Sequence, residues 1–411
     1  KTPSVSELRR QGHVTAKQPG ADRLVETVSR HGIQVEWDDE SHNTFTVYYA
    51  YSGEVHMKDF DRLKKCEIQF AKHVREKSRG VIQRPFAMTV KPSGSRRMPG
   101  QDFTDYYQWH QRLRTHKTDN WTPFELGGRQ SHEGAELARQ RKLDKVREWV
   151  RDNKYTFNKS VKIVTTWGLI HQWHAYIAKG LCDALGAKTV LDASAGWGDR
   201  LTGFLASTSV QNIILCDPRP EAASAYRRQH KDVCSEKMLQ IVTSSAQEGL
   251  RTVMLPPDRV DLCLTSPPYG NLELYPDNPG STGQVHASCR GNEQYLHHFA
   301  FPVLDQQIRM LGTTGVIALN VCDNKDREVS ICQPILDYMG DQPTMEFVGT
   351  LIMTQQGDHD EPIYVWCHEG QGDRVRAAIL PQAAAAVAAP TKKPVARPGK
   401  KRRYISSDSE D

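Results

Sequence analysis

The feature that most constrains the fold is a regular alternation of apolar runs and helical patterns between about residues 155 and 370. Strands that alternate with helices of this length form βαβ units with a largely parallel sheet. Each apolar run has the length and composition of a buried strand. The runs are KTVLDAS (188–194), NIILCDP (212–218), LQIVTSS (239–245), DLCLTSPPY (261–269) and TGVIALNVCD (314–323).

Two more apolar runs, EFVGTLIMT and PIYVWCH, follow with only a tight polar link between them. Consecutive strands joined so closely imply an antiparallel hairpin at the end of the sheet. The sequence therefore predicts an α/β fold with a Rossmann-like sheet of seven strands and an antiparallel last strand. At 411 residues the chain has room for a second domain or attached arms. It contains no run of about 18 apolar residues, so we expect no membrane span.

The first predicted strand ends at Asp192 and runs into the turn ASAGWGD. In open α/β sheets a ligand binds at the carboxyl ends of the strands. Gly196 and Gly198 permit a sharp turn and a close approach of the backbone to such a ligand. The second strand is followed by another acid, Asp217, which can accept hydrogen bonds from both ribose hydroxyls of an adenosine-type ligand. An ordinary strand-to-helix turn has a similar glycine pattern, so the glycines alone do not decide.

Two kinds of nucleotide-like ligand compete for this turn. The dinucleotide fingerprint G-x-G-x-x-G requires a third glycine where this chain has Leu201, and it leaves Asp199 where phosphate would approach. A ligand with a cationic centre, an amino-acid end and no phosphate would instead favour Asp192 and Asp199. S-adenosylmethionine is such a molecule. The role of Arg200 stays open, because it can pair with a neighbouring acid or contact a phosphate.

The fourth predicted strand runs directly into Ser266-Pro267-Pro268-Tyr269. Proline cannot continue a strand ladder because it lacks an N–H group. The two prolines therefore stiffen the chain and give nearby carbonyl groups fixed directions. Rigid acceptors beside an aromatic ring suit a planar base with an exocyclic amine, whose methylation would depend mainly on positioning. A purely structural turn could use the same residues, but their place on the fourth strand beside the expected cofactor favours a binding role.

Together, D-x-S-A-G-x-G at 192–198, the acid after the second strand and S-P-P-Y resemble the S-adenosylmethionine-dependent amino-methyltransferases. That family modifies cytosine N4 or adenine N6 in DNA, and relatives act on RNA and on protein glutamine. The resemblance covers roughly residues 155–370. It implies a seven-stranded sheet, S-adenosylmethionine as cofactor, and a target amine held by Ser266, Pro267, Pro268 and Tyr269. The cofactor-binding residues that it implies are Asp192, Ala193, Ser194, Ala195, Gly196, Gly198, Asp217, Ser245, Ala246 and Thr265.

Only 74 residues (192 to 266) separate the two motifs, so no target-recognition domain fits between them. Recognition is expected to come from residues 1–150 and the loop 270–291. The first of these is expected to be an α+β extension with a pair of strands at 33–52 and a basic helix at 57–77. Its basic residues are interleaved with aromatic ones, which favours either base stacking or an aromatic mini-core with a solvated rim. The aromatic residues concerned are Tyr106, Tyr107, Trp109 and Trp121.

The expected organisation is an N-terminal recognition region (1–150), a methyltransferase domain (151–375) and a disordered tail (376–411). The tail joins an alanine-rich run to KKRR at 400–403, which is compatible with nuclear import, although a merely solvated tail has the same composition. Nine scattered cysteines without a CxxC pair are expected to be reduced thiols. The histidine pair His171 and His174 is expected to pack rather than to bind metal.

The sequence thus predicts an enzyme that transfers a methyl group from S-adenosylmethionine to cytosine N4 or adenine N6, with DNA favoured as the partner. The net charge of +5 is too small to imply a nucleic-acid partner by itself. An RNA base methyltransferase is the first alternative. A cofactor-binding but inactive nucleic-acid-binding module is the second.

Overall fold

The structure is a computed structural model that describes fourteen segments of the chain. These are residues 33–37, 45–49, 55–72, 87–92, 98–114, 116–117, 172–233, 236–253, 259–268, 273–274, 289, 291–323, 329–354 and 360–379. No helix among them is long and apolar enough to cross a membrane. Trp121, His171, Tyr269 and the basic cluster 400–403 lie outside the described residues.

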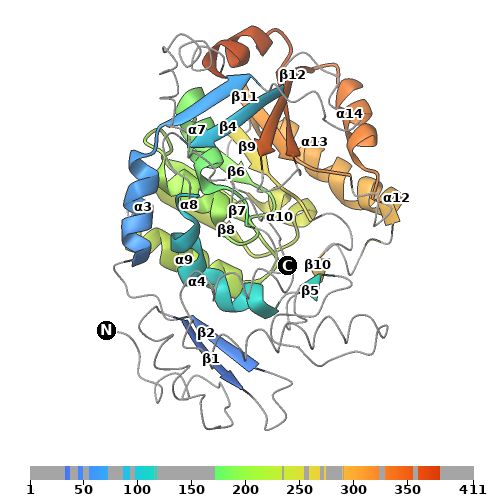
Figure 1. Ribbon diagram of the computed structural model, residues 1–411. Coiled ribbons are helices and arrows are strands. Elements are labelled where there is room, and N and C mark those ends of the chain that lie inside the picture. Colours follow the sequence, from blue (N-terminus) through green and yellow to red (C-terminus); the bar gives the residue numbers. More distant parts are fainter. Residues whose placement is uncertain are drawn as a thin grey trace, which may run out of the picture.

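Seven strands form the predicted sheet, in the spatial order β8-β7-β6-β9-β11-β13-β12 (Figure 1). All neighbours in it are parallel except β13, which is antiparallel to both β11 and β12. The fold predicted from the alternation, with its antiparallel last strand, is confirmed. The strands are β6 (Thr189–Asp192), β7 (Asn212–Cys216), β8 (Met238–Val242), β9 (Val260–Thr265), β11 (Leu311–Asn320), β12 (Met345–Thr354) and β13 (Asp360–His368).

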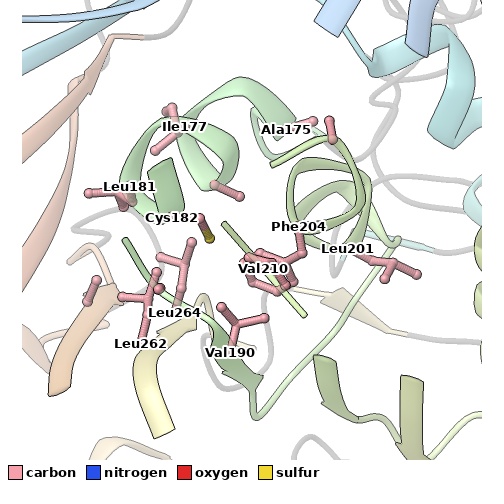
Figure 2. Close-up of a cluster of buried hydrophobic side chains, with 14 of the residues drawn as sticks. Ala175, Ile177, Leu181, Cys182, Val190, Leu201, Phe204, Val210, Leu262 and Leu264 are labelled. Carbon is pink, nitrogen blue, oxygen red and sulfur yellow. The ribbon is translucent and has the colours of Figure 1, made fainter. Parts of the chain in front are cut away.

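Helices cover both faces of this sheet, and the strand side chains alternate between two cores. In β6, Val190 packs on the face covered by α7, α8 and α9, whereas Leu191 packs on the face covered by α10, α13 and α14. Figure 2 shows the first core, where Phe204 and Leu181 lie over Leu262 and Val190. The helices are α7 (Ala175–Leu185), α8 (Asp199–Ala206), α9 (Pro220–Val233), α10 (Ala246–Thr252), α12 (Gly291–Tyr295), α13 (Phe301–Met310) and α14 (Cys332–Gly340).

The N-terminal region extends the same sheet. Strand β4 (Ala87–Pro92) pairs in parallel with β12, and β3 (Ile68–Lys72) pairs antiparallel with β4, which gives nine strands in all. Helices α3 (Val55–Lys65) and α4 (Gln101–Arg114) contribute Leu63 and Phe103 to the core shared with α7 and α8. The boundary at residue 150 therefore does not separate two cores in the described part of the chain.

Several predicted boundaries are corrected by tertiary contacts. The helix expected over 57–77 ends at Lys65, because IQFAK (68–72) pairs as a strand with β4. Helices α12 and α13 are joined by a π-helical turn, η2 (Leu296–Ala300), just before Pro302, which cannot donate a helical hydrogen bond. The start of the expected tail is also wrong, since 372–379 form a helix that buries Val375 and Ile379. Residues 380–411 lie outside the described residues.

The predicted pair of strands near the N-terminus is confirmed as the antiparallel hairpin β1 (Ile33–Trp37) and β2 (Phe45–Tyr49). The aromatic residues divide between the two alternatives. Tyr107 is buried in the core, whereas Tyr106 is 41% exposed and stacks on His56 with ring centroids 3.8 Å apart. The eight described cysteines are free thiols, six of them buried, as expected.

Helices α7 and α8 approach closely at Gly203. A methyl group added there would lie 2.3 Å from the main-chain oxygen of Ala175 and 2.6 Å from Cβ of Ala178. We expect Gly203→Ala to force the helices apart and to lower the free energy of unfolding by about 1–3 kcal/mol, as overpacked cores do. Urea titration measures this loss. The matched control is Gly340→Ala at the end of α14, where an added methyl meets nothing within 4 Å. Equal stability of the two variants would contradict the prediction.

Candidate functional site

The predicted site residues follow four neighbouring parallel strands, so they lie along one edge of the sheet. Asp192 ends β6 and Asp217 follows β7. Ser245 follows β8 and Ser266 follows β9. The parallel pairing of β8, β7, β6 and β9 places the four carboxyl ends side by side. This edge contains residues that are up to 74 positions apart in the sequence (192 to 266).

The turn after β6 has the tight geometry that its glycines predict. Gly196 and Gly198 have φ angles of 60° and 79°, in the left-handed region that favours glycine. The Ala195 N–H donates to the Cys216 carbonyl at 3.0 Å, which ties the turn to the end of β7. A side chain at Gly198 would also meet Gln229, whose Oε1 would lie 2.8 Å from the added Cβ. Helix α8 begins directly afterwards at Asp199.

Asp192 is fully buried, and its carboxylate stabilises this turn by hydrogen bonds. One oxygen accepts hydrogen bonds from the Thr265 hydroxyl at 2.9 Å and from the Ser194 N–H at 3.1 Å. The other accepts from Nε of Arg200 at 2.7 Å. The prediction that Arg200 can pair with a neighbouring acid is confirmed. Arg200 therefore balances the charge of Asp192 within the protein. Attraction between an unpaired Asp192 carboxylate and a cationic ligand is no longer the reason to place Asp192 at the site.

Arg200 is 4% exposed, so its electrostatic environment depends on this pair. Burial lowers the pKa of Arg200, but Asp192 and Asp199 raise it, and the pKa ends above its usual value. The guanidinium also donates to the Ser194 carbonyl and lies over the Trp173 ring, 5.5 Å from its centroid. Arg200 thus stays charged and braces the turn from inside the fold.

Trp173 connects this turn to the end of β11. Its indole N–H donates to Oδ1 of Asn320 at 3.0 Å, and Asn320 donates to the Pro362 carbonyl at 2.9 Å. Asn320 is fully buried, in agreement with a position at the end of a strand. Trp173 precedes α7 and belongs to none of the motifs, so only the tertiary structure reveals its place here.

Asp217 is likewise buried and surrounded by donors. Arg219 donates to it through Nε at 2.9 Å and through Nη2 at 2.8 Å. The Gly196 N–H donates to it at 3.1 Å, and the Tyr226 hydroxyl lies 3.0 Å away. Burial first, and Asp217 second, raise the pKa of Tyr226 well above its usual value, so this phenol stays protonated. Arg219 and Tyr226 were absent from the predicted site, although both follow Asp217 within ten residues.

The remaining cofactor candidates are mostly buried. Ser245 precedes α10, and its hydroxyl is buried with no hydrogen-bond partner among the described residues. Such an orphaned hydroxyl is typical of a position completed by a ligand or a water molecule. Ala193, Ala195, Ala246 and Thr265 are at most 4% exposed, so their side chains pack within the fold. Any contact between these four residues and a ligand would come mainly from their main chain.

The SPP segment (Ser266–Pro268) follows directly after the end of β9. Thr265 and Pro267 are buried, whereas Ser266 and Pro268 are half-buried. Neither proline has an N–H group, so the segment offers carbonyl acceptors and the Ser266 hydroxyl without main-chain donors at 267 and 268. Tyr269 lies outside the described residues, so its stacking role stays a prediction.

S-adenosylmethionine fits part of this site and meets one obstacle. The left-handed glycine turn allows close approach, and the orphaned Ser245 hydroxyl provides a buried polar group at the same edge. Asp217 has the chemistry to bind a ribose, but Arg219 already occupies both of its oxygens. The residues present therefore fit the cofactor once Arg219 moves away from Asp217.

A short two-stranded sheet lies beyond the SPP segment. Strand β5 (His116–Lys117) follows α4, and strand β10 (Glu273–Leu274) belongs to the loop 270–291. The two pair antiparallel, with Glu273 opposite Lys117 and Leu274 opposite His116. The two regions in which recognition was expected are thus joined by backbone hydrogen bonding within five residues of Pro268 (268 to 273).

The solved structures named below resemble this chain only distantly. No family profile matches the chain, and no curated protein matches it. TrmN from Thermus thermophilus is 16% identical and covers 49% of this chain and 51% of its own, with a TM-score of 0.33. The N-methyltransferase NodS from Bradyrhizobium japonicum WM9 is 11% identical and covers 47% and 93%, also at 0.33. The rRNA methylase from Streptococcus thermophilus is 10% identical and covers 48% and 96%, at 0.31. Because these scores are low, the fold assignment rests on the strand order of this chain.

Proposed function

We propose that this protein transfers a methyl group from S-adenosylmethionine to the exocyclic amine of a nucleic-acid base, cytosine N4 or adenine N6. The observation that carries the proposal is the assembly of the glycine turn, Asp217, Ser245 and the SPP segment along one edge of the sheet. A cofactor group and a target-amine group side by side are what a direct transfer requires.

The cofactor, when bound, would supply an electrophilic methyl group. The main chain of the glycine turn would contact the cofactor. Asp217 would accept hydrogen bonds from its ribose, and Ser245 would lie beside its adenine. The Ser266 hydroxyl and the carbonyls of Ser266 and Pro267 would accept hydrogen bonds from the target amine and orient its lone pair. Transfer would form a nitrogen–carbon bond as the sulfur–carbon bond of the donor breaks, and the amine would release one proton to solvent. No covalent intermediate with the protein is needed, so the rate depends on positioning.

Two features of the N-terminal region favour a nucleic-acid substrate. Helix α4 presents the exposed Tyr106, stacked on His56, and leads to β5, which pairs with β10 beyond the SPP segment. An exposed aromatic stack offers a base-stacking surface. A duplex substrate would have to flip its target base into the site. We favour DNA on the family resemblance alone, and RNA is the alternative.

The test incubates the full-length protein with labelled S-adenosylmethionine and either DNA or RNA, digests the product to nucleosides and identifies them by mass spectrometry. N4-methylcytosine or N6-methyladenine is the expected product. Label found only in RNA would select the RNA alternative. Cofactor binding without any methylated nucleoside would support the inactive module and contradict the proposal.

A further inference from the structure

Asp217, the acid expected to bind the ribose, already accepts hydrogen bonds from other groups of the protein. Both oxygens of Asp217 accept from the Arg219 side chain, and one of them also accepts from the Arg219 main-chain N–H at 3.0 Å. The Gly196 N–H donates to the second oxygen, and the Tyr226 hydroxyl lies within hydrogen-bond distance of it. All of these contacts are within the fold, with Asp217 4% and Arg219 7% exposed.

The acceptor capacity of the carboxylate is therefore used up. An ionised carboxylate has about four lone-pair sites, and four N–H donors from Arg219 and Gly196 already point at it. A ribose that offers two hydroxyl donors needs two of those sites. The other two donors are main-chain N–H groups, which cannot turn away without a change in the backbone conformation. Only the two donors of the Arg219 side chain can move away from Asp217 by a rotation of the side chain. Arg219 is the group that a ribose must replace.

Arg219 is held in this position by more than the ion pair. Its guanidinium lies over the Trp197 ring, 4.4 Å from the centroid, and it donates to the Gly196 carbonyl. The same side chain therefore covers Asp217 and clamps the Gly196–Trp197 part of the turn. Lysine lacks the planar guanidinium, so it cannot form both the two-pronged pair with Asp217 and the stack on Trp197.

We propose that Arg219 is an internal competitor of the cofactor, which closes the ribose site in the free protein and must leave Asp217 before the cofactor binds. This inference rests on the proposed function. A ligand that needs a minor open state binds with an affinity reduced by the fraction of that state. Removal of the Arg219 fork should therefore strengthen cofactor binding, which is the opposite of what loss of a binding residue does.

The experiment titrates the full-length protein with S-adenosylhomocysteine by calorimetry, which requires no turnover. Arg219→Gln is expected to lower the dissociation constant by about tenfold, because the open state no longer competes with the closed pair. Arg219→Lys keeps a counter-charge for the buried Asp217 and protects folding, and we expect it to lower the constant by a smaller factor. Arg227→Gln is the matched control, since Arg227 lies on the exposed side of α9 and its loss should leave the constant unchanged.

The outcomes separate the two levels of the proposal. Unchanged binding in both folded Arg219 variants, with normal binding in wild type and Arg227→Gln, would overturn the role of Arg219 alone. Weaker binding in both would make Arg219 part of the cofactor site instead of its competitor. Failure of the wild type to bind S-adenosylhomocysteine or S-adenosylmethionine would overturn the proposed function, and the inference with it.

Discussion

Replacement of Ser266, Pro267, Pro268 and Tyr269 by alanine is expected to lower the rate of methyl transfer by at least about 10³-fold. Positioning of two reactants contributes on the order of 7–11 kcal/mol to catalysis, so loss of the segment that orients the amine removes much of the rate. The measurement is the initial rate of label transfer to nucleic acid. Cofactor affinity should change little, because the glycine turn, Asp217 and Ser245 follow other strands.

The matched control for this variant is Asp217→Asn, which should weaken cofactor affinity and leave the target-amine segment intact. The two variants are therefore expected to separate binding from transfer. If the alanine variant loses both cofactor affinity and transfer while it remains folded, the target-amine site has been misplaced. If it keeps full transfer, the SPPY segment is a structural turn.

Arg200→Met is expected to lower the free energy of unfolding by about 3–5 kcal/mol. The substitution leaves the carboxylate of Asp192 buried without its counter-charge, and such a break in a buried pair is strongly destabilising. The side chains of Arg200 and Asp192 are 5% and 0% exposed, and their atoms lie 2.7 Å apart. Urea titration followed by circular dichroism measures the loss.

Two further variants test the cause. Arg376→Met breaks a pair of similar length, 2.8 Å from Glu346, whose side chains are 22% and 29% exposed. It should cost only about 0–1 kcal/mol, because solvent screens the charges. In Asp192→Asn combined with Arg200→Met, position 192 no longer carries a charge that lacks its partner, so part of the stability should return. A single loss at Arg200 no larger than the loss at Arg376 would refute this account of the turn.

The sheet itself was predictable because its signal is local. Runs such as NIILCDP and TGVIALNVCD have a strand period and composition that few other structures accommodate, and the tight link before PIYVWCH leaves room only for a hairpin. The sheet places Asp192 and Asp217 at adjacent strand ends, as predicted. The error at 57–77 arose because the helical pattern continued into IQFAK, whose pairing with β4 is a contact over about 20 residues.

The interior of the site was less predictable. The sequence placed Arg200 directly after the glycine turn but did not identify its partner. Its pairing with Asp192 depends on the direction in which α8 begins after the turn. Arg219 was overlooked because no motif contains it, although its position two residues after a strand-end acid is a signal that could have been used. Trp173 meets Asn320 across 147 residues, which no local pattern can indicate.

The amino-acid sequence by itself determined the α/β class, the seven strands with an antiparallel last strand and the positions of the two motifs. It could do so because alternation, turn chemistry and strand ends are properties of neighbouring residues. Only the tertiary structure decided that β3 and β4 extend the sheet, that Arg200 neutralises Asp192 and that Arg219 closes Asp217. The sheet extension depends on pairing between segments far apart in the chain, such as Ala87 with Thr350. The two ion pairs depend on burial, since a charge removed from water needs a partner within the fold.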